Sequence, residues 1–255
     1  MIYAFCGDRQ IAVEILAFMI KQGFPPVILV LSDQGKATHD KELIELVTEA
    51  GDCQIFRGND INSNTFIEVA SRMSLDYAFS IHFPYIITAL ALRIPKRGFI
   101  NLHPSFLPFN KGWHTPSWPI LEKTPAGASL HYMAEELDAG DIIIQQEVIV
   151  RPEHTANSLY EDILRAELDI FKEIFPNIMD FSVSGIKQPH GGSSHSRKQL
   201  SSMDVQEICL NKSYQASDLI DRLRALTTNN VKEAAYFIKH GKKYRIQVEI
   251  TVDDD

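Results

Sequence analysis

Asn101-Leu-His103-Pro-Ser-Phe-Leu-Pro108 tells most about the fold of this chain, and it begins inside a predicted strand over 99–102. Asp138 stands 35 residues after His103, in the turn Leu137-Asp-Ala-Gly140-Asp141. Asn101 and His103 are two positions apart on the strand, so their side chains share one face. An amide, an imidazole and a carboxylate within reach of one another can move an acyl group without a covalent enzyme intermediate.

Short apolar runs alternate with helical patterns before this stretch. We predict strands over 2–6, 27–31, 53–56, 76–81 and 99–102, and helices from Arg9 to Gly23, over 39–50 and over 62–73. This alternation predicts a parallel sheet that is covered by helices on both faces.

The pattern changes after the stretch. Alternating runs over 128–133 and 142–149 predict a hairpin, or two strands joined by a loop. An amphipathic helix is predicted over 155–178, started by Thr155 or Asn157 and broken near Pro176. A polar, flexible Gly/Ser-rich segment follows over 189–199, and then come a helix over 215–226 and strands over 234–239 and 243–250.

The two motifs together resemble the formyltransferase family that uses 10-formyltetrahydrofolate. In that family an Asn-x-His-Pro-Ser-x-Leu-Pro stretch follows a parallel strand, and a Leu-Asp-x-Gly turn completes the site. Asn101, His103 and Asp138 stand at those positions. The continuation is similar to the branch that formylates amino sugars carried on a nucleotide, typically a dTDP-linked 4-amino-4,6-dideoxyhexose: Phe109-Asn-Lys111-Gly-Trp113-His-Thr-Pro-Ser-Trp118.

This resemblance implies an α/β fold with two parts. A Rossmann-like formyltransferase core is expected over 1–184, and a small α+β C-terminal subdomain over 200–252. A Gly/Ser-rich linker over 185–199 is expected to join them.

The three motif residues have distinct chemical capacities. Asn101 can donate an amide N–H to a developing oxyanion, and loss of such a donor costs about 3–4 kcal/mol. His103 can carry the proton or, when charged, act as a second oxyanion donor, and the sequence leaves both roles open. Asp138 can hold the imidazole or an ordered water. Either motif alone is typical of an ordinary hydrogen-bonded turn, but their joint occurrence favours a catalytic trio.

The resemblance also implies where the ligands bind. The loop after the strand over 76–81 and the 138–141 turn are expected to hold the folate, mainly through backbone groups, at His82, Phe83, Tyr85, Ile87 and Asp141. His82 is equally compatible with a solvated side chain. The nucleotide sugar is expected to contact Asp8, Arg9, Lys111, Trp113 and Tyr236. Asp8 is equally compatible with a helix cap, and Trp113 and Trp118 with core packing. The region around Tyr236 lacks the Pro-rich stretch of relatives, so a dimer contact is an equal alternative there.

Composition and charge exclude several classes of protein. The 255 residues carry a net charge of −8, whereas a general nucleic-acid binder needs a basic face. Nine His residues show no metal-ligand spacing, so no metal is expected. No apolar run approaches the roughly 20 residues that span a bilayer, and the N-terminus lacks the basic region of a signal peptide. Cys6, Cys53 and Cys209 are widely separated, as in a reduced protein. We predict a cytoplasmic homodimer with no nucleic-acid or membrane partner.

The predicted activity is formyl transfer from 10-formyltetrahydrofolate to the amine of a nucleotide-linked, dTDP-type amino-deoxy sugar, for surface polysaccharide synthesis. A methionyl-tRNA formyltransferase would need a larger and more basic tail than 185–255, which carries 11 Lys/Arg against 9 Asp/Glu. Glycinamide ribonucleotide formyltransferase is disfavoured because Gly7-Asp8-Arg9 is not a Gly/Ser-rich phosphate loop. A formyltetrahydrofolate hydrolase-like enzyme and a non-catalytic ligand-binding module are the remaining alternatives.

Overall fold

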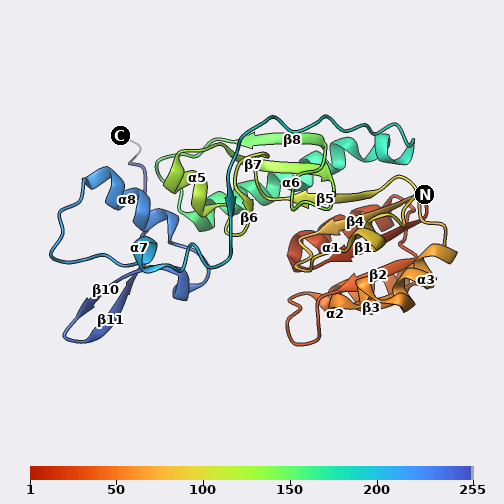
Figure 1. Ribbon diagram of the computed structural model, residues 1–255, viewed down its shortest axis with the longest axis horizontal. Helices are drawn as coiled ribbons and strands as arrows, with labels where there is room; N and C mark the ends of the chain where they lie inside the picture. The colour runs from red at the N-terminus through yellow and green to blue at the C-terminus, as the bar shows by residue number, and fades with distance from the viewer. Residues whose placement is uncertain (254–255) are drawn as a thin grey trace. The chain divides into compact units, whose positions relative to one another are not determined.

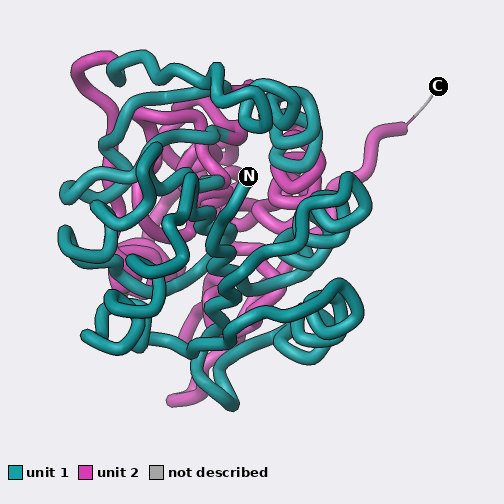
Figure 2. Tube along the Cα trace, turned by 90° about the vertical axis from the view of Figure 1, so that its right-hand side faces the viewer, with its two compact units in different colours: residues 1–103, 129–144, 167–188 teal, residues 104–128, 145–166, 189–255 magenta. Residues whose placement is uncertain are grey.

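The computed structural model describes residues 1–253. The chain divides into two compact units, and each is assembled from segments far apart in the sequence (Figure 2). Unit 1 contains 1–103, 129–144 and 167–188, and unit 2 contains 104–128, 145–166 and 189–255. The division into sequence-continuous domains over 1–184 and 200–252 stays a prediction.

A seven-stranded sheet runs in the order β3-β2-β1-β4-β5-β7-β8 (Figure 1). The strands from β3 to β5 pair in parallel, and β7 pairs antiparallel with β5. Their bounds are β1 (Tyr3–Gly7), β2 (Ile28–Leu31), β3 (Gln54–Arg57), β4 (Tyr77–Ile81), β5 (Phe99–His103), β7 (Ala126–Tyr132) and β8 (Ile142–Val148). The predicted α/β class is confirmed, and the two alternating runs are neighbouring strands.

Both faces of the parallel sheet in unit 1 are buried. Alternate side chains of β1 and β4 point to opposite faces. On one face Phe79 contacts Tyr3 at 5.4 Å and Phe171 of α6 (Ala156–Met179) at 5.9 Å, measured between ring centroids. On the other face Ala4 and Ala78 pack in a cluster with Phe66 of α3 (Asn64–Arg72). Near-continuous apolar strands are what a sheet covered on both sides requires.

Five helical segments precede β5, of which the first, second and fourth begin and end near the predicted positions and the other two were not predicted. They are α1 (Arg9–Lys21), α2 (Asp40–Ala50), the 3₁₀ segment η1 (Gly58–Asn62), α3 (Asn64–Arg72) and the short α4 (Ala89–Leu92). Ser63 caps α3 by accepting the N–H of Phe66 at 3.1 Å.

Helix α6 (Ala156–Met179) starts at the predicted cap but runs through Pro176. At its start the N–H of Thr155 donates to Ser158 Oγ at 3.0 Å, and the N–H of Ser158 donates to Thr155 Oγ1 at 3.3 Å. The predicted break near Pro176 is wrong. Proline removes one backbone hydrogen bond, but Phe175 and Ile178 are buried on either side of it and hold the last turn in place.

Unit 2 contains the α+β C-terminal region with its antiparallel pair of strands. Its core gathers Trp118, Leu200, Ile208, Leu226 and Ala235. The elements are β6 (Lys111–Gly112), α5 (Ser117–Glu122), β9 (Ser194–His195), α7 (Met203–Gln206), α8 (Ala216–Ala225), η2 (Val231–Glu233), β10 (Ala235–Lys239) and β11 (Lys242–Ile246). The predicted α+β character of this region is confirmed.

Part of the segment over 189–199 contacts the rest of unit 2, and the flexibility predicted from its Gly/Ser content stays a prediction. Strand β9 pairs in parallel with β6. The ring of His195 stacks on Trp118, with 3.8 Å between centroids and 8° between planes. The imidazole of His195 is therefore buried against an indole although the segment around it is locally polar.

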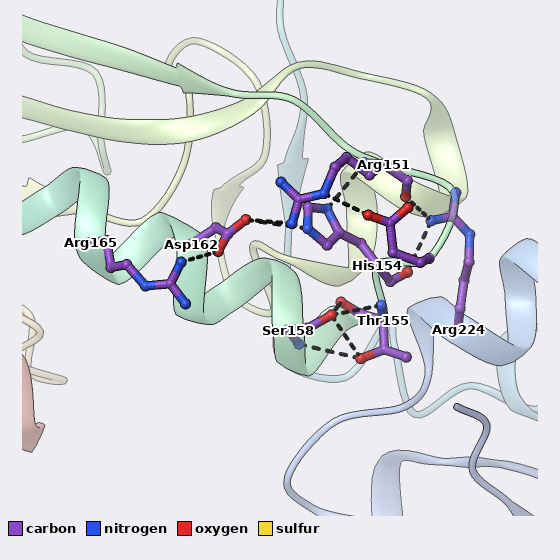
Figure 3. A network of polar contacts seen from close by, with 8 residues as sticks. Arg151, His154, Thr155, Ser158, Asp162, Arg165 and Arg224 are labelled. Atoms are coloured by element: carbon purple, nitrogen blue, oxygen red, sulfur yellow. Dashed lines mark hydrogen bonds and ion pairs between the residues drawn. The ribbon is translucent and has the colours of Figure 1, made fainter. Parts of the chain in front are cut away.

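A polar network ties α8 to the turn before α6 within unit 2 (Figure 3). Arg224 is 7% exposed, and its Nη1 donates to the carbonyls of Arg151 and His154, both at 2.9 Å. Its Nε lies 2.7 Å from Asp221 Oδ1. Arg165, in contrast, has a side chain that is 70% exposed and reaches only Asp162.

Arg224→Ala is expected to lower the free energy of unfolding by about 2–3 kcal/mol, because two carbonyls and a carboxylate lose a buried charged partner. Arg165→Ala is the matched control and should cost less than about 1 kcal/mol, because exposed ion pairs contribute little. Urea unfolding at neutral pH measures both values. Equal losses in the two variants would contradict the anchoring role of Arg224.

Candidate active site

The pairing of β5 with β7 builds the centre of the site in unit 1. The register places Asn101 opposite His131 and His103 opposite Ser129. Asn101 Nδ2 lies 3.1 Å from His131 Nε2. The residue opposite an amide on a neighbouring strand is its nearest cross-strand partner, so this contact follows from the register.

The backbone decides which way the His131 imidazole acts. Its Nδ1 lies 2.8 Å from the carbonyl oxygen of Tyr132, which can only accept a hydrogen bond. Nδ1 therefore carries the proton, and Nε2 accepts from the Asn101 amide. One N–H of Asn101 is thereby committed, its amide plane is oriented, and its second N–H can donate to an oxyanion.

His103 and Asp138 form the second half of the site. His103 Nε2 lies 3.6 Å from Asp138 Oδ2, and both side chains are 9% exposed. Asp138 Oδ1 lies 3.9 Å from His131 Nε2. The rings of His103 and His131 stand at 89° to each other, with centroids 6.3 Å apart. The structure thus brings the amide, the imidazole and the carboxylate together.

The turn that carries Asp138 is held from two sides. Asp138 has a left-handed backbone with φ 51°. Gln188 Nε2 donates to the carbonyls of Asp138 and Gly140, both at 2.8 Å. A Cβ on Gly140 would lie 1.8 Å from the carbonyl oxygen of Tyr132, so this position accepts only glycine.

Sequence reasoning missed His131 and Gln188 as members of this site. His131 appeared only as one residue of an alternating strand, and Gln188 as the residue before a polar segment. A predicted antiparallel register between the strands over 99–102 and 128–133 would have placed His131 opposite Asn101. No local pattern singles out Gln188.

The arrangement fits proton-coupled transfer of an acyl group to a neutral nucleophile. It offers an oriented N–H donor, and an imidazole whose partner carboxylate can stabilise its charged form.

Comparison with known families fits this chemistry. Residues 4–175 match the formyl transferase family model, and residues 203–252 match the N-formyltransferase dimerization C-terminal domain. The chain belongs to the formyl transferase family. The protein is therefore an N-formyltransferase enzyme.

Curated relatives of this formyl transferase differ in what they act on. The chain is 27% identical over 149 residues to the dTDP-4-amino-4,6-dideoxyglucose formyltransferase of Mycobacterium bovis, covering 58% of the chain and 63% of the relative. It is 23% identical over 247 residues to the methionyl-tRNA formyltransferase of Syntrophus aciditrophicus, covering 95% and 77%. It is 29% identical over 175 residues to the bifunctional polymyxin resistance protein ArnA of Wigglesworthia glossinidia brevipalpis. This match covers 68% of the chain but only 26% of ArnA.

A solved structure is similar to the formyl transferase over nearly its whole length. The 4-N formyltransferase from Francisella tularensis has a TM-score of 0.81 and 26% sequence identity, and the match covers 98% of each chain.

The predicted folate-binding residues that follow β4 lie in unit 1 with their side chains engaged by protein. Phe83 and Ile87 are 8% and 6% exposed and pack with Ala91, so they can offer only backbone groups to a ligand. The Tyr85 hydroxyl accepts the N–H of Asp33 at 3.0 Å. Asp141 accepts the N–H of Tyr132 through its carbonyl at 2.9 Å. Their role as folate contacts stays a prediction.

His82 is not solvated. Its Nε2 lies 2.9 Å from both carboxylate oxygens of Glu167, and its side chain is 5% exposed. The imidazole therefore points to α6, and only the backbone of His82 is left for a direct ligand contact.

The predicted sugar-nucleotide residues are divided between the units. In unit 1, Arg9 is exposed at the start of α1. In unit 2, Lys111 is half-buried in β6, and Trp113 is 37% exposed beneath the guanidinium of Arg197, 5.0 Å from the ring centroid.

The side chain of Tyr236 is engaged by protein groups, and its predicted contact with the nucleotide sugar stays a prediction. Tyr236 is 5% exposed, its hydroxyl donates to Glu207 at 3.1 Å, and Lys243 lies over its ring at 3.8 Å. Protein groups therefore occupy both the hydroxyl and the ring.

Asp8 serves as the cap of α1, and its predicted contact with the nucleotide sugar stays a prediction. Its carboxylate accepts from the N–H of Arg9 at 2.8 Å, the N–H and hydroxyl of Thr38 at 3.0 and 2.8 Å, and the hydroxyl of Ser32 at 2.7 Å. Burial raises the pKa of Asp8, but these hydrogen bonds outweigh it and leave the pKa below its ordinary value.

Asp8→Asn is expected to destabilise the fold at neutral pH by about 1 kcal/mol or more. The pKa of Asp8 is lower in the folded than in the unfolded state. The ionised carboxylate therefore stabilises the fold above about pH 4, and this stabilisation is lost as the pH falls through the folded pKa. Urea unfolding between pH 7 and pH 3 should therefore show the difference from wild type shrinking toward low pH. The exposed Asp52→Asn is the control, and a pH-independent difference would contradict the prediction.

Side-chain groups that could hold a metal ion and helices that could span a membrane are both absent among the described residues. Residues 1–253 contain no group of three or more His, Cys, Asp or Glu side chains that could hold a metal ion. None of the helices within these residues has the length and apolar content needed to cross a membrane.

Proposed function

We propose that this enzyme transfers the formyl group of 10-formyltetrahydrofolate to the amino group of a nucleotide-linked amino-deoxy sugar. The observation that carries the proposal is the buried cluster of Asn101, His103 and Asp138 in a chain of the formyl transferase family. The match of 203–252 to an N-formyltransferase C-terminal domain favours an amine as acceptor.

The proposed reaction needs no group beyond these side chains. The neutral amine attacks the formyl carbon, and the carbonyl oxygen becomes an oxyanion that the second N–H of Asn101 stabilises. The oxyanion then collapses, so that the carbonyl re-forms and the bond from the formyl carbon to N10 of the folate breaks. His103 takes the proton from the amine and returns it to N10, while Asp138 holds the charged imidazole. The products are tetrahydrofolate and a formamido sugar.

The nucleotide is proposed to be dTDP, and the product to serve surface polysaccharide synthesis. The name of the mycobacterial relative and the 109–118 continuation support this assignment. Trp113, with a partly exposed indole, remains the candidate contact in unit 2. We also propose that the enzyme is a homodimer, which the dimerization-domain match supports. Its proposed compartment is the cytoplasm.

Methionyl-tRNA formylation is the second candidate, because a relative of that name aligns over 95% of the chain. The net charge of +2 over 185–255 argues against it, since RNA binding depends on a basic surface. A gel shift with initiator tRNA at physiological salt tests this candidate directly.

The deciding assay mixes the protein with 10-formyltetrahydrofolate and a panel of dTDP- and UDP-linked amino sugars, and follows tetrahydrofolate release and product mass. Gain of one formyl group on a single sugar is the expected result. Folate release without sugar modification would indicate a hydrolase, and no release with any sugar would overturn the proposal.

A further inference from the structure

Glu167 is a buried carboxylate that the proposed mechanism does not use. It lies on α6 with 0% exposure, on the same helix face as the buried side chains of Ile170 and Phe171. Both of its oxygens lie 2.9 Å from His82 Nε2. An acidic side chain almost never occupies such a position unless it is paired.

Packing alone gives no reason for an ionisable pair at this place. An apolar side chain of similar volume at position 167 would extend the buried apolar face that Ile170 and Phe171 form on α6. Replacement of buried polar pairs by apolar residues is often neutral or stabilising. The pair therefore points to a need for a fixed geometry at His82.

His82 is the point where β4 becomes the loop 82–88. Its backbone is left-handed with φ 51°, which a non-glycine residue adopts only where its surroundings hold it. The imidazole is held by α6, whereas the next side chain, Phe83, packs into the cluster of the opposite sheet face. The loop is thus fixed from both faces of the sheet at its first two residues.

This loop leaves the same sheet edge as the candidate catalytic residues. Ser80 and Ile81 of β4 pair in register with Asn101 and Leu102 of β5. Ligands of open α/β sheets bind at the carboxyl ends of the strands. A displacement of the loop backbone would therefore change the geometry of the proposed folate site beside Asn101.

We propose that Glu167 is a positioning residue, which acts through His82 to hold the 82–87 backbone in the shape that receives the folate co-substrate. This inference rests on the proposed function. Glu167 contacts His82 and not the reacting atoms, so its effect falls on folate affinity and not on the rate of the chemical step.

The test measures binding of 5-formyltetrahydrofolate by fluorescence, together with kcat and KM for both substrates, in the full chain. Glu167→Leu is expected to raise the Kd and KM for folate about tenfold or more, with kcat at saturating folate within about threefold of wild type. The KM of the sugar should not change. Glu173→Leu, at an exposed position of the same helix, is the matched control and should resemble wild type.

A double-mutant cycle separates positioning from general stability. His82→Ala should reproduce the loss of folate affinity, and the double variant should be no worse than either single one, because the two side chains act as a unit. If Glu167→Leu fails to fold, the isosteric Glu167→Gln replaces it in the cycle, with a smaller rise in folate Kd.

Three outcomes are separable. Additive losses, or a folded Glu167 variant with wild-type folate affinity, would overturn the inference while leaving the proposed function intact. A loss confined to kcat would also overturn it. Failure of the wild-type chain to bind 5-formyltetrahydrofolate would overturn the proposed function itself.

Discussion

Asn101→Ala, His103→Ala and Asp138→Ala are each expected to reduce kcat by about two orders of magnitude or more while the fold stays intact. Asn101 supplies the N–H aimed at the oxyanion, and His103 moves the proton between the two nitrogens. Asp138 lies 3.6 Å from His103 Nε2 and holds the imidazole when it becomes charged. Each removal takes away an interaction that strengthens only in the transition state.

The measurement is kcat at saturating folate and acceptor, with thermal unfolding to check each fold. The exposed His190→Ala is the control for loss of an imidazole and should keep wild-type activity. His131→Ala should lose activity as well, because the Asn101 amide then loses the acceptor that orients it. Wild-type rates in all three trio variants would disprove the mechanism.

Gly140→Ala is expected to reduce kcat by about 100-fold, because small misplacements of a reacting group carry costs of this size. The added Cβ would meet the carbonyl oxygen of Tyr132 at 1.8 Å. That backbone cannot yield easily, since the N–H of Tyr132 is bonded to the carbonyl of Asp141 at 2.9 Å. The turn must therefore move, and Asp138 moves with it.

Gly35→Ala is the matched control for this substitution. Gly35 also has a restrictive backbone, with φ 82°, but its Cβ would meet nothing within 4 Å. It should lose about 1 kcal/mol of stability and no activity. A folded Gly140→Ala variant with wild-type kcat would show that the turn does not place Asp138.

Local patterns predicted most of the secondary structure and the three motif residues. Apolar runs placed the strands, and Thr155, one of the two predicted starts of α6, caps it, because strand periodicity and helix caps depend on neighbours within a few residues. Asn101 and His103 share a face for the same reason. The sequence could also place Asp138 in a turn, since Gly140 and its neighbours carry turn chemistry.

Where these local patterns were insufficient, long-range packing determined the backbone conformation and the side-chain partners. Pro176 did not break α6, because buried Phe175 and Ile178 outweighed the lost hydrogen bond. The side chain of His195, in a locally polar segment, packs against Trp118. Asp8 accepts from Thr38, 30 residues away, and Tyr236 donates to Glu207, 29 residues away, and no local pattern reveals such partners.

The sequence by itself determined the family, the α/β alternation and the identity of the residues proposed to act on the formyl group. Only the tertiary structure decided how those residues are supported. His131 faces Asn101 because of the β5–β7 register, Gln188 reaches the Asp138 turn across 50 residues, and Glu167 meets His82 across 85. The physical reason is that chain-local rules fix backbone conformation and side-chain direction, whereas the partner of a buried polar group is chosen by how distant segments pack.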